Sequence, residues 1–353
     1  MGDRGDQTAR EVTHRGIEER RTLMALGMLN GYVWGPINPE DVVPIPGTTW
    51  VVASGMLGPT APLGRLYIID RHDLSCSELF PYGGRFEPDI DRFGDCRVLD
   101  PATFEPHGID VTVRSDGVVE VYVVSHGGGE FVDVFEVDLG SLRPTATWIG
   151  SAAMPEFTFG NDVAASGDGA FFVSSTSDTE GGAEVGLARM AAGEETGKVV
   201  EWQLGRGFTT VPGSAICSAN GVAVSADRQW LYIAGWSSRC VRKVSLTKDP
   251  IEITTVATDI MVDNLTWTPD GDLLAAGAYD TSMEEFLAGH YGTGHRLGLP
   301  SRVLRIDPDT LAIETIIDYG PETYGVATTG VQVGAEIWVG AARDRGIARF
   351  TVT

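Results

Sequence analysis

A short phrase recurs six times along the 353-residue chain, and it restricts the possible folds more than any other feature. Each copy has two small or polar residues, then an aliphatic residue and two followers, and successive copies start 43 to 67 positions apart. The copies begin at Glu40, His107, Asn161, Asn220, Asp263 and Tyr324. Self-similarity at such intervals is typical of folds that are built from repeated supersecondary units.

Strand-like segments follow each copy of the phrase, and Gly and Pro residues separate them. The first segments are Trp50–Ala53, Val119–Val124, Ala170–Val173, Trp230–Ala234, Asp272–Ala276 and Glu336–Val339. The second segments are Arg65–Ile69, Val132–Val137, Val199–Leu204, Val241–Leu246, Arg302–Ile306 and Gly346–Thr351. If the phrase begins the innermost strand of each unit, these segments are the second and third strands, and a weaker fourth strand follows in several units. The sequence therefore predicts an all-β, six-bladed β-propeller. We expect residues near Tyr32 to Trp34 to complete the C-terminal blade, so that the ring has no open sheet edge.

Helical periodicity is credible only near the N-terminus, where Glu11 to Leu29 form a charged pattern that ends at Asn30-Gly31. Everything after it is expected to be strand. The sequence thus predicts a short helical arm over residues 1–29 and a single catalytic propeller domain over residues 30–353.

Charge and composition exclude several classes of function. The formal net charge of −23 repels phosphate backbones and anionic membrane surfaces, so a nucleic-acid partner is not expected. No apolar run is long enough for a membrane span, and the charged N-terminus has no apolar core of a signal peptide. The four cysteines lack CxxC spacing, which suits a reducing compartment. We expect a cytoplasmic protein that acts on a small molecule.

The phrase also carries the chemistry, because the innermost strands of a propeller line its central channel. Carboxylates or carboxamides stand at most of the six starting positions, and burying charge without a partner costs several kcal/mol. Numerous oxygen ligands, with no thiolate and one imidazole in the ring, favour Ca²⁺ over Zn²⁺. Calcium is therefore the predicted cofactor.

Two calcium ions are predicted, because neighbouring strand residues face opposite sides. A site at the channel mouth would use Glu40, Asn161, Asn220, Asp263 and Asn264, and a deeper site would use Asp41, Asp162 and the carbonyl of Ile109. Each set contains two carboxylates, which balance one divalent ion. The alternative is that these groups bond only to one another and to loop backbones.

His107 lies in the same ring, and His126 ends the next strand of its blade. This placement predicts a catalytic pair in which His107 deprotonates water, while His126 orients His107 or relays the proton from it. Asp263 is the alternative base or nucleophile.

As a set, these phrases resemble the paraoxonase (arylesterase) family of six-bladed propeller lactonases, related to the SMP-30 and gluconolactonase-like propellers. The resemblance is carried in order by Pro39-Glu40-Asp41, Pro106-His107-Gly108-Ile109, Val124-Ser125-His126, Gly160-Asn161-Asp162-Val163, Ala219-Asn220-Gly221-Val222 and Val262-Asp263-Asn264-Leu265. It implies that the mouth site holds a catalytic calcium, that the deeper site holds a structural one, and that His107 and His126 form the family's histidine dyad.

The chain also departs from the family pattern. No cysteine lies near either terminus to tether the chain ends, and a charged stretch replaces the apolar N-terminal segment of secreted relatives. A further active-site histidine is replaced by Ala278 and Tyr279, followed by a loop over residues 280–300. We expect this loop to select the substrate. Four residues are expected to contact the substrate: Tyr279, His290, His295 and Tyr324.

The predicted function is Ca²⁺-dependent hydrolysis of lactones or related carboxylic esters. Two alternatives stay open at this point. One is a Ca²⁺-dependent lyase, isomerase or epoxide-opening enzyme on the same site. The other is a non-catalytic propeller, stabilised by calcium, that binds a protein partner.

Overall fold

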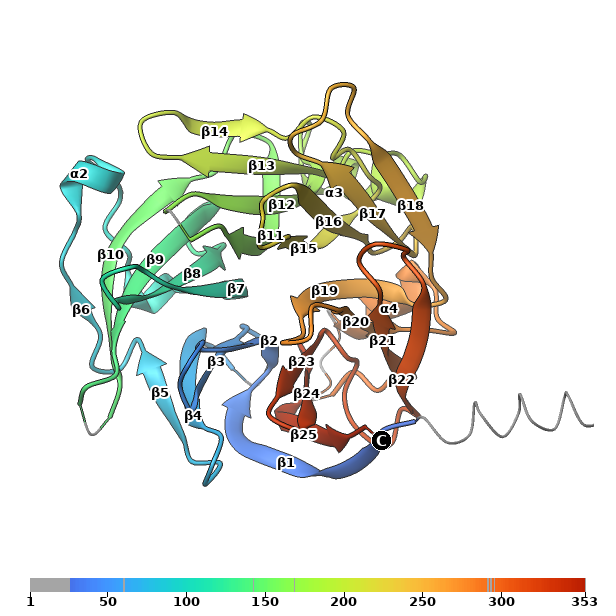
Figure 1. Ribbon diagram of the computed structural model, residues 1–353, viewed down its shortest axis with the longest axis horizontal. Coiled ribbons are helices and arrows are strands. Elements are labelled where there is room, and N and C mark those ends of the chain that lie inside the picture. The colour runs from blue at the N-terminus through green and yellow to red at the C-terminus, as the bar shows by residue number, and fades with distance from the viewer. Residues whose placement is uncertain are drawn as a thin grey trace, which may run out of the picture.

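Six sheets surround a central axis, and each sheet forms one blade of a closed ring (Figure 1). The computed structural model describes residues 26–352, apart from Thr60, Leu142, Asp168, Tyr291, Thr293 and His295. The predicted six-bladed β-propeller is confirmed.

The first five blades follow one another along the chain. Blade 1 contains β2 (Pro39–Pro44), β3 (Trp50–Gly55), β4 (Arg65–Asp70) and β5 (Cys76–Phe80). Blade 2 contains β7 (Pro106–Val113), β8 (Val119–Ser125), β9 (Phe131–Asp138) and β10 (Thr145–Ala153), with β6 (Arg85–Phe86) at its outer edge. Blade 3 contains β11 (Thr158–Ala165), β12 (Phe171–Asp178), β13 (Lys198–Gln203) and β14 (Gly207–Thr210). Blade 4 contains β15 (Ala219–Val224), β16 (Trp230–Gly235), β17 (Cys240–Ser245) and β18 (Ile253–Ala257). Blade 5 contains β19 (Met261–Trp267), β20 (Leu273–Ala278), β21 (Ser301–Ile306) and β22 (Ile313–Tyr319).

Blade 6 closes the ring, because it combines strands from both ends of the chain. It contains β23 (Thr329–Val333), β24 (Glu336–Gly340) and β25 (Arg345–Thr351), and β1 (Met28–Ile37) pairs antiparallel with β25. The predicted closure through Tyr32 to Trp34 is confirmed. The four cysteines, all within the described ranges, are free, so hydrogen bonds between β1 and β25 make this closure.

The predicted N-terminal helix ends too late. Met28 and Leu29 already belong to β1, where they pair with Thr351 and Phe350. Strand pairing along β25 therefore outweighs the weak helical pattern at this point. Residues 1–25, which hold the rest of the predicted arm, lie outside the described residues.

The hydrophobic core is divided into wedges between neighbouring blades. Val52 of blade 1 and Val121 of blade 2 share one cluster, and Tyr122 of blade 2 and Phe171 of blade 3 share the next. Similar clusters lie between blades 3 and 4, 4 and 5, 5 and 6, and 6 and 1. Each blade thus buries both faces only when its two neighbours are in place.

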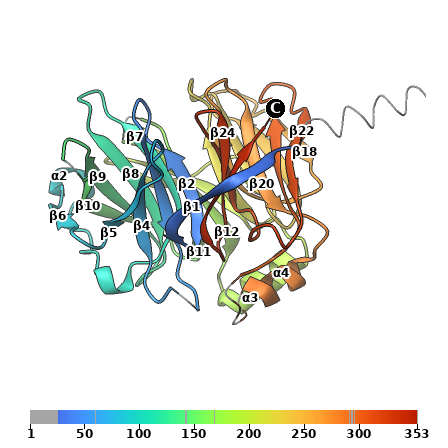
Figure 2. The same ribbon diagram turned by 90° about the horizontal axis from the view of Figure 1, so that it is seen from below.

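Two helices lie together on one face of the ring (Figure 2). They are α3 (Ala183–Ala191), between β12 and β13, and α4 (Met283–His290), between β20 and β21. The expectation that only strands follow residue 30 is wrong here, because helices of eight or nine residues show too few turns for a clear periodic pattern. Phe286 of α4 packs against Trp236, with 4.8 Å between ring centroids. No helix in the described ranges has the length and apolar content needed to cross a membrane.

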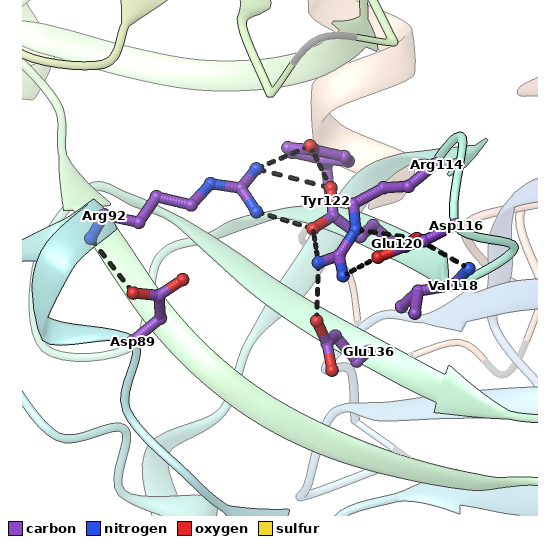
Figure 3. Close-up of polar contacts among 8 residues, drawn as sticks. All are labelled: Asp89, Arg92, Arg114, Asp116, Val118, Glu120, Tyr122 and Glu136. Atoms are coloured by element: carbon purple, nitrogen blue, oxygen red, sulfur yellow. Dashed lines mark hydrogen bonds and ion pairs between the residues drawn. The ribbon is translucent and has the colours of Figure 1, made fainter.

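A charged network fastens the long connection between blades 1 and 2, which includes α2 (Ile90–Phe93) and the 3-10 turn Pro101–Thr103, onto β8 (Figure 3). Arg92 of α2 donates to Glu120 Oε1 at 2.5 Å and to the hydroxyl of Tyr122 at 2.7 Å. Arg114 contacts Glu120 at 3.2 Å and Glu136 at 2.7 Å. The buried Glu120 carboxylate is therefore shared by two guanidinium groups.

Candidate functional site

The repeated phrase folds as a β-bulge in five of the six inner strands. In blade 1, Pro39 pairs with Gly55 but Val42 pairs with Ala53, so β2 carries one extra residue. The bulge lets both Glu40 and Asp41 reach the channel, where they line cavities at opposite ends. Strict alternation of side chains, assumed from the sequence, does not hold at these positions.

A cavity of about 380 Å³ opens on the face that carries α3 and α4. Its floor is polar and contains Glu40, His107, Asn161, Asn220 and Asp263. Its walls are largely apolar and include Met56, Phe159, Leu187, Met190, Trp236, Phe286 and Leu287. The structure thus brings four predicted mouth-site ligands and the predicted catalytic histidine together at one place.

Several oxygen atoms at this floor are buried without a hydrogen-bond partner among the described residues. They are Glu40 Oε2, Asn161 Oδ1 and Asn220 Oδ1, together with Oδ1 of Asn264, which does not line the cavity but donates to Glu40. Leaving one such group unsatisfied costs about 1–3 kcal/mol, so native proteins keep few of them without a ligand. These atoms fit a hard cation that binds oxygen.

Carboxylates alone would not be enough for that cation. Within the described part of the chain, no group of three or more His, Cys, Asp or Glu side chains could hold a metal ion. A metal ion at the channel mouth would therefore need the amide oxygens as well as Glu40 and Asp263. A ligand set of oxygen atoms alone favours Ca²⁺ over Zn²⁺.

Electrostatics at the floor favour the same class of ligand. Burial, reinforced by Asp41, Asp263 and Asp162, raises the pKa of Glu40 well above its ordinary value. Burial also raises the pKa of Asp263 to about 8, although a hydrogen bond from Asn220 opposes this shift. A divalent cation would let both groups stay ionised.

The deeper carboxylates, Asp41 and Asp162, are bonded to the backbone. Asp41 accepts from the N–H of Val42 at 2.8 Å and from that of Ile109 in blade 2 at 3.0 Å. Asp162 makes the same pair of bonds, to Val163 at 2.7 Å and to Val222 of blade 4 at 2.8 Å. Each carboxylate therefore links its blade to the next, which is a structural role in itself.

Asp110 is a third carboxylate of this kind that the sequence analysis missed. It accepts from Val111 at 2.7 Å and from Ala165 of blade 3 at 2.7 Å, and burial raises its pKa to about 7. It lies outside the first two positions of the phrase, so the repeat gave no sign of it.

The predicted histidine pair is in contact. His107 Nδ1 lies 2.9 Å from His126 Nε2, and His107 Nε2 lies 3.4 Å from Asn161 Nδ2 and 3.9 Å from Glu40 Oε1. Burial, together with His126 and His290, lowers the pKa of His107 well below its ordinary value. His107 is therefore neutral near pH 7, the state in which one ring nitrogen can accept a proton.

A further carboxylate extends this pair. Glu130 Oε1 lies 3.0 Å from His126 Nδ1, on the side away from His107. Sequence reasoning missed Glu130, although it follows His126 by four residues across the Gly127–Gly129 turn. A single sequence offers no sign that this turn folds back.

Two of the residues expected to contact substrate lie elsewhere. Tyr279 does not line the mouth cavity, because its hydroxyl donates to Asp318 at 2.8 Å and the Arg302 guanidinium covers its ring at 3.8 Å. Tyr324 is buried in the wedge between blades 5 and 6, where its hydroxyl donates to the Gly346 carbonyl at 2.5 Å.

The sixth copy of the phrase was placed wrongly, because it does not start an inner strand. Tyr324 precedes β23 by five residues, and Thr328 lines the cavity in its place. His290, at the end of α4, does line the cavity. His295 lies outside the described residues.

Comparisons with known proteins agree with this architecture. The arylesterase family model matches residues 39–318. Serum paraoxonase/lactonase 3 from Homo sapiens is 22% identical over 260 residues, which cover 69% of this chain and 67% of that protein. Two solved structures share the fold at 14% identity and a TM-score of 0.55. Regucalcin, a calcium-binding protein from Agrobacterium tumefaciens, aligns over 92% of this chain and 93% of its own. A luciferin-regenerating enzyme aligns over 93% of this chain and 97% of its own.

Proposed function

Because the chain belongs to the arylesterase family, we propose that it is a Ca²⁺-dependent hydrolase of lactones or related carboxylic esters. One observation carries the proposal: unpartnered buried oxygens converge beside a contacting histidine pair at the floor of a cavity. The human relative is a paraoxonase/lactonase, which supports the same class of substrate.

Two ion sites are proposed. Glu40, Asn161, Asn220, Asp263 and Asn264 would hold the catalytic ion, and Asp41, Asp162 and the Ile109 carbonyl would hold the structural one. When bound at the mouth, Ca²⁺ supplies Lewis-acid polarisation of the scissile carbonyl and stabilises the negative charge that develops on its oxygen.

The chain's own residues would activate the water. The Nε2 atom of neutral His107 faces the cavity floor and accepts the water proton, while Nδ1 contacts His126. General-base catalysis of this kind contributes typically ~10² to 10⁴ in rate. Asp263, on the same floor, is the alternative base or nucleophile.

The cavity also indicates what part of a substrate it binds. Leu187, Met190, Trp236 and Phe286 form walls above a polar floor. Such a shape suits a molecule with an apolar substituent and one polarisable carbonyl. The buried carboxylates and the net charge of −23 favour a neutral substrate over an anionic one.

The test is hydrolysis of a panel of γ- and δ-lactones and aryl esters by the full chain. Proton release measures the rate. Activity should disappear after EDTA treatment and return with Ca²⁺. A calcium-loaded protein that hydrolyses nothing in the panel would contradict a hydrolase. Products that carry no added water would instead favour the lyase, isomerase or epoxide-opening alternative.

A matched pair of variants tests the histidine pair. His107→Gln should lower kcat by ~10² to 10⁴ with little change in KM. His72→Gln is the control, because His72 is exposed on the turn after β4. Near-normal kcat in His107→Gln would exclude the pair as the base and leave Asp263 in that role.

A further inference from the structure

The Glu130 carboxylate contacts His126 on the side away from the cavity. Its two oxygens lie 3.0 and 3.1 Å from His126 Nδ1, and Oε2 also accepts from the Gly160 N–H at 2.7 Å. The His126 ring stacks on Phe159, with 4.7 Å between centroids and 8° between planes. The imidazole is thus held on one face and at both nitrogens.

We propose that Glu130 is a positioning residue that fixes the tautomer of His126 and, through it, that of His107. The inference rests on the proposed hydrolase function and deepens it. A carboxylate accepts hydrogen bonds only, so His126 must carry its proton on Nδ1. Its Nε2 is then an acceptor for the Nδ1–H of His107. His107 therefore presents a lone pair on Nε2 to the cavity floor, as a general base requires.

The same contact accommodates the charge that catalysis creates. As water attacks the carbonyl carbon, its proton passes to His107 Nε2 and the Nδ1 proton of His107 passes to His126 Nε2. The positive charge then rests on His126, 3.0 Å from the Glu130 carboxylate. Both side chains are mostly buried, with exposed fractions of 10% and 23%, so solvent screens this pair only weakly. The proton returns to the leaving oxygen when the C–O bond breaks.

Glu130→Gln is a sharp test, because the Gly160 N–H constrains the new amide. The amide oxygen must stay at the Oε2 position to accept from Gly160. The NH₂ group then takes the Oε1 position, 3.0 Å from His126 Nδ1, where it donates and favours Nδ1 as an acceptor, although the amide oxygen still lies 3.1 Å from Nδ1. The substitution therefore shifts His126 toward carrying its proton on Nε2 and His107 toward carrying its own on Nε2, which removes the lone pair at the cavity floor.

Three measurements on the full chain test the proposal. Glu130→Gln should lower kcat about 10- to 100-fold on the best lactone or ester, with KM and bound calcium unchanged. The same substitution in a His126→Gln background should cost nothing further, because Glu130 acts through His126. The ¹⁵N shifts of His126 should show a protonated Nδ1 in the unmodified protein and a protonated Nε2 in Glu130→Gln. With six histidines in the chain, His126→Gln assigns the signals. Glu156→Gln, an exposed site before β11, is the control and should change none of these.

Three results would overturn the proposal. The first is a kcat of Glu130→Gln within twofold of the unmodified protein while His107→Gln is impaired, even if the melting temperature falls. The second is a His126 tautomer that does not change. The third is an equal loss of kcat in the His126→Gln background, which would leave Glu130 as a link between blades 2 and 3. If no ester is hydrolysed at all, the proposed function fails, but the tautomer measurement still decides the role of Glu130.

Discussion

The Asn264 amide donates a hydrogen bond to Glu40, with 2.8 Å between Nδ2 and Oε1, although 224 positions separate the two residues. This bond joins blade 5 to blade 1 at the channel. It uses the amide donor and leaves Glu40 Oε2 and Asn264 Oδ1 without partners among the described residues. A network that served only to hold blades together would satisfy its own acceptors. The surplus of oxygen acceptors instead suits a cation.

The first prediction concerns the ions. Purified protein should contain two tightly bound calcium ions, because each proposed site contains two carboxylates. A ligand bound only by the folded state stabilises it by about 2.7 kcal/mol when its free concentration is 100 times Kd. EDTA should therefore lower the melting temperature measured by calorimetry. Zinc, no tightly bound divalent ion, or no shift in EDTA would contradict the assignment.

The second prediction separates the catalytic ion from the fold. Asn220→Ala should abolish turnover while the protein stays folded, because Asn220 lines the mouth cavity and its Oδ1 bonds to nothing in the described chain. Asn30→Ala, at an exposed position in β1, is the matched control. Turnover with circular dichroism checks both. A folded, active Asn220→Ala protein would remove this residue from the site.

The third prediction concerns the deeper carboxylates. Asp41→Ala should lower the free energy of unfolding by several kcal/mol, because it leaves the N–H groups of Val42 and Ile109 buried without an acceptor, at about 1–3 kcal/mol each. Urea unfolding measures the loss, and Asp73→Ala, on an exposed turn, is the comparison. If Asp41→Ala is as stable as the unmodified protein while Asn220→Ala unfolds, the two sites are inverted.

The fourth prediction is a pH dependence of stability. Burial tends to raise the pKa of Glu120, but its bonds with Arg92 and Tyr122 outweigh this and hold the pKa below 4.5. A carboxylate with a lowered folded-state pKa stabilises the fold above its unfolded pKa, and this is lost as pH falls through the folded value. Glu120→Gln should thus cost about 3 kcal/mol at pH 7 and less as pH falls below about 4. Denaturant unfolding across this range, with Glu156→Gln as control, checks the sign. A pH-independent difference would contradict it.

The repeat made most of the fold predictable. The two strands predicted after each phrase lie in the expected places, and the β1 to β25 closure followed from the need to remove sheet edges. Packing against the ring, rather than local pattern, determines α3 and α4, so they could not be predicted. The helical arm over residues 1–25 and the cytoplasmic location stay predictions.

The candidate site was predictable only where the phrase recurs. The five mouth residues and His107 lie where the bulges place them. Thr328 was missed because no bulge marks the sixth strand and Tyr324 offered a false match. Glu130 reaches the site through a glycine turn, and Asp110 stands at a follower position of the phrase rather than at its polar start. Both depend on three-dimensional approach that spacing does not encode.

The last prediction concerns substrate choice by α4. Leu287 lines the cavity wall, so Leu287→Ala removes apolar contact without touching the polar floor. At about 0.8 kcal/mol per buried CH₂, the loss should reach about 1–2 kcal/mol for lactones with long alkyl chains. That is a 5- to 30-fold drop in kcat/KM. Unsubstituted lactones and calcium content should be unaffected. Leu204→Ala is the control, because Leu204 is 64% exposed and lies away from the cavity. An equal drop for short and long substrates would show that α4 does not bind the alkyl chain.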